Sequence, residues 1–128
     1  YLGNLNAMRD WGHAKDFVEA QWLMLQQEKP EDFVIATGKQ YSVKDFINEA
    51  AKNLDMEISW GGKGLDEVGS FNGQEIIKVD PRYFRPTEVE TLLGNPNKAK
   101  KILKWKSETT ITQLIDEMIE YEVQNQNK

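Results

Sequence analysis

The chain has 128 residues, 39% of them hydrophobic and 29% charged, with a formal net charge of −5. This length accommodates one modest domain, and the composition is that of a soluble chain without a membrane-spanning segment. The negative charge argues against a nucleic-acid surface. Zero cysteines exclude disulfides and thiolate metal sites and suit a cytoplasmic protein, and a single histidine leaves no metal site to expect.

Hydrophobic periodicity predicts helices that alternate with short strands. The first helix is predicted over 14–28, and the apolar run "DFVIATG" (32–38) fits a buried strand. The most regular helix is predicted over 42–54, where Ser42 and Asp45 resemble a capping pair. The pattern therefore indicates an α/β fold.

The second half of the chain continues this alternation. Strands are predicted over 56–60 and 75–80, and the five glycines of "GGKGLDEVGSFNG" (61–73) between them predict a mobile loop. A short helix is predicted over 97–103, after a capping Asn95 and a first-turn proline. The last predicted helix follows a capping Thr110 and ends in the polar, fraying tail "QNQNK".

Motifs for catalysis are absent from the sequence. Gly62 and Gly64 begin a Gly-x-Gly-x-x-Gly pattern, but Glu67 stands at its third position, so no dinucleotide-binding turn is indicated. No Ser-His-Asp or Cys-His pattern is present, and His13, which precedes the first helix, is interpreted as structural. The residues alone predict no catalytic site.

The stretch "DPRYFRPTEVE" (80–90) predicts an anion-binding surface instead. Two prolines restrict the backbone around Arg85, so its guanidinium loses less entropy when it binds a phosphate. Glu88 is suited to accept hydrogen bonds from a sugar diol. An equally weighted interpretation has Arg85 pairing at the surface with Glu88 or Glu90, where an ion pair contributes little.

The first stretch, "GNLNAMRDWG" (3–12), combines hydrogen-bond donors with a flat indole, a mixture suited to a nucleotide. The alternative is a turn in which the asparagines cap backbone groups and Arg9 pairs with Asp10. Three tryptophans are interpreted as core anchors: Trp22, Trp60 and Trp105. Five lysines are interpreted as the solvent face and C-terminal end of a short helix: Lys98, Lys100, Lys101, Lys104 and Lys106.

Four stretches together resemble the C-terminal part of the GDP-mannose 4,6-dehydratase family. They are "LGNLNAMRDWGHAKDFVEAQWLMLQQ", "DFVIATGKQYSVKDFINEA", "GKGLDEVG" and "VDPRYFRPTEVETLLGNPNKAKKILKW", which cover nearly the whole chain. The resemblance implies the C-terminal substrate-binding portion of an extended short-chain dehydrogenase/reductase whose Rossmann core is absent here. Residues 1–12 would form a substrate-binding segment, 13–38 a helix and strand that pack on the missing Rossmann domain, and 39–128 the substrate-binding domain.

The resemblance also implies roles for residues. Arg9 and Arg85 would hold the diphosphate of GDP-mannose from two sides, Glu88 would bind the ribose hydroxyls, and Asn4 would face the diphosphate or sugar. The family converts GDP-mannose to GDP-4-keto-6-deoxymannose, a precursor of GDP-fucose and related sugars, with NADP held by the Rossmann domain. This chain would then carry no catalytic or cofactor-binding residue, and on its own it is expected to be inactive.

The resemblance implies that the full-length enzyme is a homodimer or homotetramer, assembled largely through its Rossmann domain. One departure concerns a turn, since the family commonly reads Leu-Gly-Trp where this chain has Leu103-Lys104-Trp105. Two alternative functions remain open: the substrate domain of another nucleotide-sugar epimerase or reductase, and a non-catalytic remnant that binds GDP-sugars or a protein partner.

Overall fold

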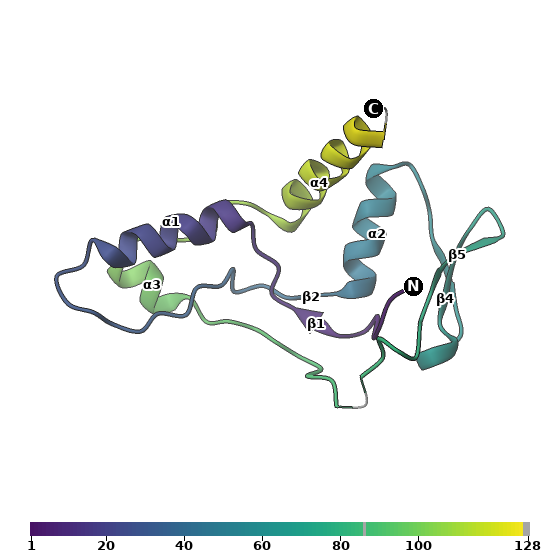
Figure 1. Cartoon of the computed structure of the whole chain (residues 1–128), viewed down its shortest axis with the longest axis horizontal. Helices are drawn as coiled ribbons and strands as arrows, with labels where there is room; N and C mark the ends of the chain where they lie inside the picture. The colour runs from purple at the N-terminus through teal and green to yellow at the C-terminus, as the bar shows by residue number, and fades with distance from the viewer. Residues whose placement is uncertain (86, 127–128) are drawn as a thin grey trace. The chain divides into compact units, whose positions relative to one another are not determined.

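The computed structural model describes residues 1–85 and 87–126. The chain has the expected α/β character, with helices and short strands that follow one another along the sequence (Figure 1). Two of the strands, β1 (Met8–Arg9) and β2 (Tyr41–Ser42), form a two-stranded sheet. Among the described residues, no helix is long and apolar enough to cross a membrane.

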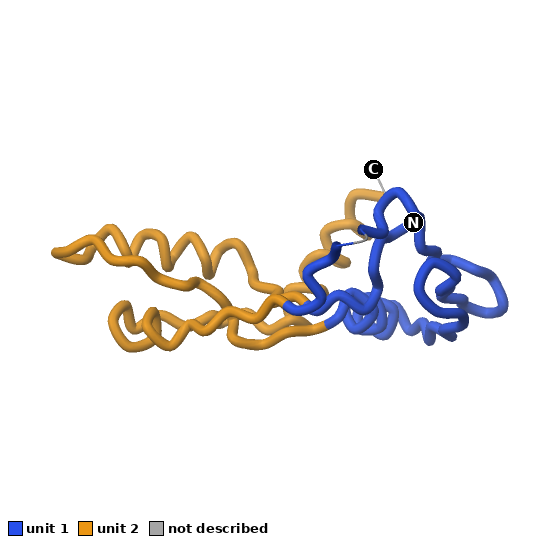
Figure 2. Tube along the Cα trace, turned by 90° about the horizontal axis from the view of Figure 1, so that it is seen from below, with its two compact units in different colours: residues 1–8, 42–91 blue, residues 9–41, 92–128 orange. Residues whose placement is uncertain are grey.

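The chain divides into two compact units, each of which combines two separate stretches of sequence (Figure 2). The first unit consists of Tyr1–Met8 and Ser42–Thr91, and the second consists of Arg9–Tyr41 and Leu92–Lys128. In each unit, an early stretch is therefore completed by a later one.

The first unit contains an antiparallel three-stranded sheet in the order β3-β4-β5. Its strands are β3 (Ser59–Gly61), β4 (Val68–Phe71) and β5 (Gln74–Lys78), with a short 3-10 helix η1 (Gly64–Asp66) before β4. The prediction of a mobile loop over 61–73 is therefore wrong, because this stretch contributes the central strand.

Two local features explain how such a glycine-rich stretch forms a strand. Asn72 and Gly73 join β4 to β5 with φ angles of 50° and 77°, and this pair of left-handed residues suits the twist of a two-residue hairpin. At Gly69, a Cβ atom would lie 2.9 Å from the Trp60 ring and 3.1 Å from the Ile58 side chain. Glycine thus lets neighbouring side chains cover the strand closely.

Helix α2 (Val43–Asn53) is held at its N-terminus by the predicted capping box. The N–H of Asp45 donates to Ser42 Oγ at 3.0 Å, and the N–H of Ser42 donates to Asp45 Oδ2 at 2.8 Å. The N–H groups of the first two helical residues donate to the carbonyls of Ala7 and Leu5, at 3.3 and 2.9 Å. Two buried residues that precede β1 therefore complete the N-terminus of the helix.

An ion pair fastens α2 to the chain just before β4. Lys44 pairs with Glu67, which is only 5% exposed, and the Lys44 ammonium also lies 5.1 Å from the centroid of the Trp60 ring. The Trp60 indole donates to Asn48 Oδ1 at 2.8 Å. Trp60 is half-buried and contacts two residues of α2, but it is not among the buried core residues of the described chain, so its predicted role as a core anchor is only partly confirmed.

The second unit contains α1 (Ala14–Leu25), α3 (Asn97–Ile102) and α4 (Ile111–Gln126). The predicted first helix is confirmed but ends earlier than expected. Thr110 caps α4 as predicted, because its Oγ1 accepts from the N–H of Gln113 at 3.2 Å. The predicted fraying tail is helical as far as α4 extends, and its last two residues lie outside the described part of the chain.

The core of the second unit forms where α1, α3 and the residues after α3 meet. Ala20, Ala99, Leu103 and Trp105 are each at most 5% exposed, and the Trp105 indole donates to the Asp16 carbonyl at 2.9 Å. Trp22, by contrast, is 59% exposed, so its predicted role as a core anchor is wrong. It lies two residues after Ala20, about 200° around the helix, and therefore faces away from this core.

Helix α3 begins at Asn97, as predicted, and ends one residue earlier than predicted, while the proline lies just before the helix and not in its first turn. Pro96 takes the N-cap position, and the Asn95 Oδ1 accepts from the N–H of the first helical residue at 3.0 Å. After the helix, Lys104 adopts a φ of 57°, the left-handed conformation that favours glycine. The five lysines of this region are all exposed, as predicted.

The apolar run at 33–36 forms no strand, which corrects the prediction. Phe33 and Ile35 pack against the core of the second unit, whereas Val34 is 53% exposed. Half-buried and exposed side chains alternate over 33–35 as they do in a strand. A strand also requires a hydrogen-bonded neighbour, and the described residues provide none for this run.

Candidate functional site

The two stretches with predicted ligand-binding residues run beside each other in the first unit. The N–H of Leu2 donates to the Lys78 carbonyl at 2.9 Å, and the N–H of Asp80 donates to the Leu2 carbonyl at 2.8 Å. Further along, the N–H of Met8 donates to the Glu90 carbonyl at 2.7 Å. The segment 1–8 is thus bonded at both ends to the segment that contains Arg85 and Glu88.

Asp80 organises the start of the second segment as a turn. Its carbonyl accepts from the N–H groups of Tyr83 and Phe84 at 2.9 and 3.1 Å. Its carboxylate accepts from the Arg82 N–H at 2.9 Å, from Nε at 3.1 Å and from Nη2 at 2.6 Å. The hydrogen bonds from Arg82 lower the pKa of Asp80 and raise that of Arg82. Arg82 is therefore committed to Asp80.

Arg85 is the other arginine of this segment, and it is exposed. Within the described part of the chain it forms no hydrogen bond or ion pair, so the interpretation in which it pairs with Glu88 or Glu90 is not supported. Pro86, one of the two prolines expected to hold Arg85, lies outside the described residues. The guanidinium of Arg85 is thus presented to solvent with its donors uncommitted.

The remaining predicted residues are half-buried. Asn4 Oδ1 accepts from the N–H of Asn6 at 3.0 Å, which forms a turn of the predicted kind. Glu88 interacts with other residues of the chain, and so does Arg9, which follows Met8 and begins the second unit. The structure therefore brings Asn4, Arg85 and Glu88 onto two bonded segments of one unit.

Close backbone packing fixes the spacing of these two segments. A Cβ atom on Gly3 would lie 2.4 Å from the Tyr83 carbonyl oxygen and 3.1 Å from its carbonyl carbon. No side chain fits there without movement of the backbone, so glycine allows the residues around Asn4 to approach the turn that precedes Arg85.

Asp10 is a framework residue that sequence reasoning missed. Its Oδ1 accepts from the Thr37 N–H at 3.0 Å and from Thr37 Oγ1 at 2.6 Å, and its Oδ2 accepts from the Gly38 N–H at 3.0 Å. The aspartate beside Arg9 therefore fixes the loop at 37–38 within the second unit. Its partners lie 27 and 28 residues away, so spacing in the sequence gives no sign of them.

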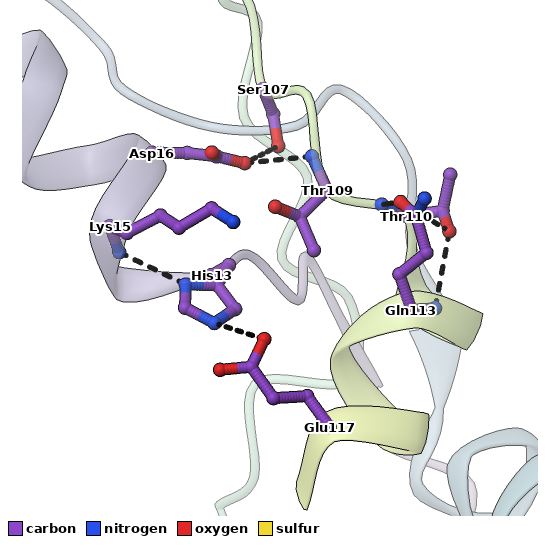
Figure 3. A network of polar contacts seen from close by, with 8 residues as sticks. All are labelled: His13, Lys15, Asp16, Ser107, Thr109, Thr110, Gln113 and Glu117. Atoms are coloured by element: carbon purple, nitrogen blue, oxygen red, sulfur yellow. Dashed lines mark hydrogen bonds and ion pairs between the residues drawn. The ribbon is translucent and has the colours of Figure 1, made fainter.

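Asp16 has a similar role at the other end of the second unit (Figure 3). Its Oδ2 accepts from Ser107 Oγ at 3.2 Å, from the Glu108 N–H at 3.1 Å and from the Thr109 N–H at 2.8 Å. Burial acts to raise the pKa of Asp16, but these hydrogen bonds outweigh it and leave the pKa below its ordinary value. A charged Asp16 thus holds the residues that lead into α4.

His13 is structural, as predicted. Its Nδ1 accepts from the Lys15 N–H at 3.0 Å and caps α1, while its Nε2 lies 3.2 Å from Glu117 Oε2 on α4 (Figure 3). No group of histidine and acidic residues suited to a metal ion occurs in the described part of the chain.

A cleft of about 270 Å³ in the second unit includes Trp11 and Tyr41 in its wall. The hydroxyls of Thr37, Ser107 and Thr110 also line it, but they already bond to Asp10, Asp16 and Gln113. The polar wall of this cleft belongs to the framework of the unit. The uncommitted Arg85 on the first unit remains the stronger candidate for ligand binding.

Comparison with known families identifies the family to which the chain belongs. The profile of the family described as GDP-mannose 4,6 dehydratase matches residues 1–118. The chain belongs to the GDP-mannose 4,6-dehydratase family. The matched range includes both bonded segments of the first unit and both carboxylate-centred networks of the second.

Curated relatives in this family share about half of their residues with the chain. It is 54% identical to the GDP-mannose 4,6 dehydratase of Dictyostelium discoideum over 126 residues, 97% of this chain and 35% of that protein. The Homo sapiens enzyme is 49% identical over 125 residues, 96% of this chain and 34% of that protein. The chain therefore spans about a third of the length of these GDP-mannose 4,6-dehydratases.

Solved structures confirm the fold of the chain. A UDP-glucose 4-epimerase from Thermotoga maritima with UDP-glucose superposes with a TM-score of 0.72 at 18% identity, over 98% of this chain and 34% of that one. A UDP-glucose 4-epimerase from Bifidobacterium longum in complex with NAD+ and UDP gives 0.69 at 22% identity, over 95% and 32%. This part of the GDP-mannose dehydratase family thus shares its α/β fold with part of these epimerases.

Proposed function

We propose that the chain is the C-terminal, substrate-binding part of a GDP-mannose 4,6-dehydratase. The whole enzyme would convert GDP-mannose to GDP-4-keto-6-deoxymannose in the biosynthesis of GDP-deoxysugars of the GDP-fucose type. Membership of the family and the matched third of the relatives' length support this assignment. The observation that carries it is the uncommitted guanidinium of Arg85, on a segment bonded to the one that contains Asn4.

Each predicted residue would bind a different part of the substrate. Arg85 and Arg9 would hold the diphosphate, because a guanidinium matches the geometry of phosphate oxygens and its charge strengthens the hydrogen bonds. Glu88 would accept hydrogen bonds from the ribose hydroxyls, and Asn4 would donate from its amide group to the diphosphate or sugar. The accepting oxygen of Asn4 is already engaged with Asn6, so its NH2 group is the part suited to a phosphate.

The nicotinamide cofactor would be held by a part of the enzyme that this chain lacks. The glycine-rich stretch after Trp60 completes β3 and forms η1 and β4, and antiparallel strands do not provide the strand-turn-helix cradle of a dinucleotide. This stretch therefore does not fit the diphosphate of a dinucleotide, and we propose that cofactor binding and catalysis lie in the N-terminal Rossmann domain. On this account, the chain alone neither turns over GDP-mannose nor binds NADP tightly.

The surface of the second unit supports docking onto that domain. On α1, Val18 and Trp22 are each 59% exposed and Leu25 is 82% exposed, while Val34 lies in an apolar run without a strand partner. The three residues of α1 recur at helical spacing on one face, and an exposed apolar face of this kind is costly to leave in water. We propose that α1 and residues 33–36 pack on the Rossmann domain, where the run would gain a neighbouring strand.

Complementation tests this function directly. The chain is mixed with a separately purified N-terminal portion of the Dictyostelium discoideum relative, and the conversion of GDP-mannose is followed by chromatography of the sugar nucleotides. We expect turnover from the mixture and none from either part, with an Arg85→Ala chain as the matched control. A mixture that forms a stable complex but never converts GDP-mannose would contradict the proposal. Equal binding of UDP-glucose and GDP-mannose would favour another nucleotide-sugar enzyme.

A further inference from the structure

Asp80 joins the two segments at one end and closes the turn that precedes Arg85. Its backbone N–H donates to the Leu2 carbonyl at 2.8 Å and thereby joins the first segment to the second. Its own carbonyl receives the N–H groups of Tyr83 and Phe84, which closes the turn just before Arg85. The Asp80 side chain is 11% exposed, whereas the side chain of its partner Arg82 is 78% exposed.

The carboxylate of Asp80 determines which arginine is available to a ligand. Arg82 donates to it through the backbone N–H, Nε and Nη2, and the Arg82 guanidinium also lies 5.6 Å from the Tyr83 ring centroid. The positive charge of Arg82 is therefore balanced within the turn. Arg85, which follows the turn, keeps its charge and its donors for an anion.

We propose that Asp80, acting through Arg82 and the turn that they close, is a positioning residue that orients Arg85 against the Asn4 segment before the substrate binds. This inference rests on the proposed role of Arg85 in binding the diphosphate. Asp80 itself would touch no part of the substrate. It would act by reducing the conformational freedom that Arg85 loses on binding.

The order of the turn is tested first, without a ligand. Amide hydrogen exchange and ¹⁵N relaxation are measured on the chain and on its Asp80→Ala and Arg82→Ala variants, with Glu75→Gln as the matched control. Glu75 is also a carboxylate paired with a cation, Lys78, but it lies outside the turn. We expect exchange at Tyr83 and Phe84 to rise by roughly tenfold or more in the two turn variants and to stay unchanged in the control.

The link to Arg85 is tested by affinity. In a complex reconstituted with the relative's N-terminal portion, Asp80→Ala should weaken GDP-mannose binding by roughly tenfold, since the backbone turn that precedes Arg85 becomes mobile. In an Arg85→Ala background, the same change should have almost no further effect. Asp80→Asn keeps an oxygen that can accept from the Arg82 N–H, and it should restore part of the affinity and provide a folded variant if Asp80→Ala does not fold.

The outcomes separate this inference from the proposed function. Unchanged exchange at Tyr83 and Phe84 in the Asp80 variants, or fully additive effects of the Asp80 and Arg85 changes, would overturn the positioning role. If the wild-type complex fails to bind GDP-mannose, the proposed function fails, while the exchange measurement still decides whether Asp80 orders the turn.

Discussion

Replacing Asp16 removes one acceptor on which three donors converge. Its Oδ2 accepts from Ser107, Glu108 and Thr109 at 3.2, 3.1 and 2.8 Å, and the residue is only 3% exposed. In Asp16→Ala, the N–H of the half-buried Thr109 loses its partner, whereas Glu108 is exposed and can bond to water instead. The connection into α4 should therefore loosen.

The magnitude follows from these contacts. A hydrogen bond to a charged group contributes about 1.5–3 kcal/mol, and a buried donor left without a partner costs about 1–3 kcal/mol. With water replacing the bond at Glu108, we expect Asp16→Ala to lower the free energy of unfolding by about 3 kcal/mol. Asp16→Asn keeps an acceptor oxygen without the charge, so it should lower this free energy by about 1–1.5 kcal/mol.

The effect of Asp16 should depend on pH in one direction. Its pKa is lower in the folded chain than its ordinary value, so the folded state favours the charged form. The stability that this charge contributes is complete above about pH 4, the ordinary pKa of aspartate, and is lost as the pH falls through the lower folded value. The difference between wild type and Asp16→Asn should therefore be constant near neutral pH and shrink in acid.

Urea unfolding followed by tryptophan fluorescence measures both effects, because Trp105 donates to the backbone of Asp16. Glu19→Gln is the matched control, since it removes a carboxylate charge from the exposed side of the same helix and should change stability by less than about 0.5 kcal/mol. If Asp16→Ala unfolds like the control, or if the difference between wild type and Asp16→Asn persists unchanged in acid, the assignment of Asp16 as a charged acceptor is wrong.

Three further predictions concern stability. Lys104→Gly should raise the free energy of unfolding by about 0.5–1 kcal/mol, because φ at this position is 57°; a lower melting temperature would contradict this. Gly3→Ala should lower it by about 1–3 kcal/mol and speed amide exchange near Tyr83, since the new Cβ would meet a backbone oxygen at 2.4 Å. Lys44→Met should lower it by about 3 kcal/mol in urea unfolding, because it leaves the buried Glu67 without its cation, and adding Glu67→Leu should recover much of that loss; no recovery in the double variant would contradict this.

Features that depend on a few neighbouring residues could be predicted from the sequence. Ser42 and Asp45 form the capping box that their spacing indicates, and Thr110 caps α4 because its partner lies one helical turn away. The turn between Asn72 and Gly73 is local too, and its hairpin signal was present in the sequence. The five glycines of residues 61–73 are typical of a loop, so they hid the hairpin signal, and the central strand was not predicted.

Features that depend on distant partners could not be predicted. The apolar run at 33–36 has the composition of a strand, but whether it forms one depends on a neighbouring strand with which its backbone can form hydrogen bonds. Asp16 receives its bonds from residues more than 90 positions away. Of the two arginines in residues 80–90, the sequence favours Arg85 as the one that binds a ligand. That Arg82 pairs with Asp80 is seen only in the folded turn.

We propose that Arg85 belongs to a binding site for the diphosphate of GDP-mannose. Calorimetric titration with GDP-mannose, of the chain alone and of the chain reconstituted with a relative's N-terminal portion, tests it at low and moderate salt with UDP-glucose as the control ligand. We predict binding that prefers GDP-mannose, weakens as salt screens the phosphate contact, and falls by roughly tenfold or more in Arg85→Ala. Binding of GDP-mannose that is unchanged in Arg85→Ala would contradict the claim.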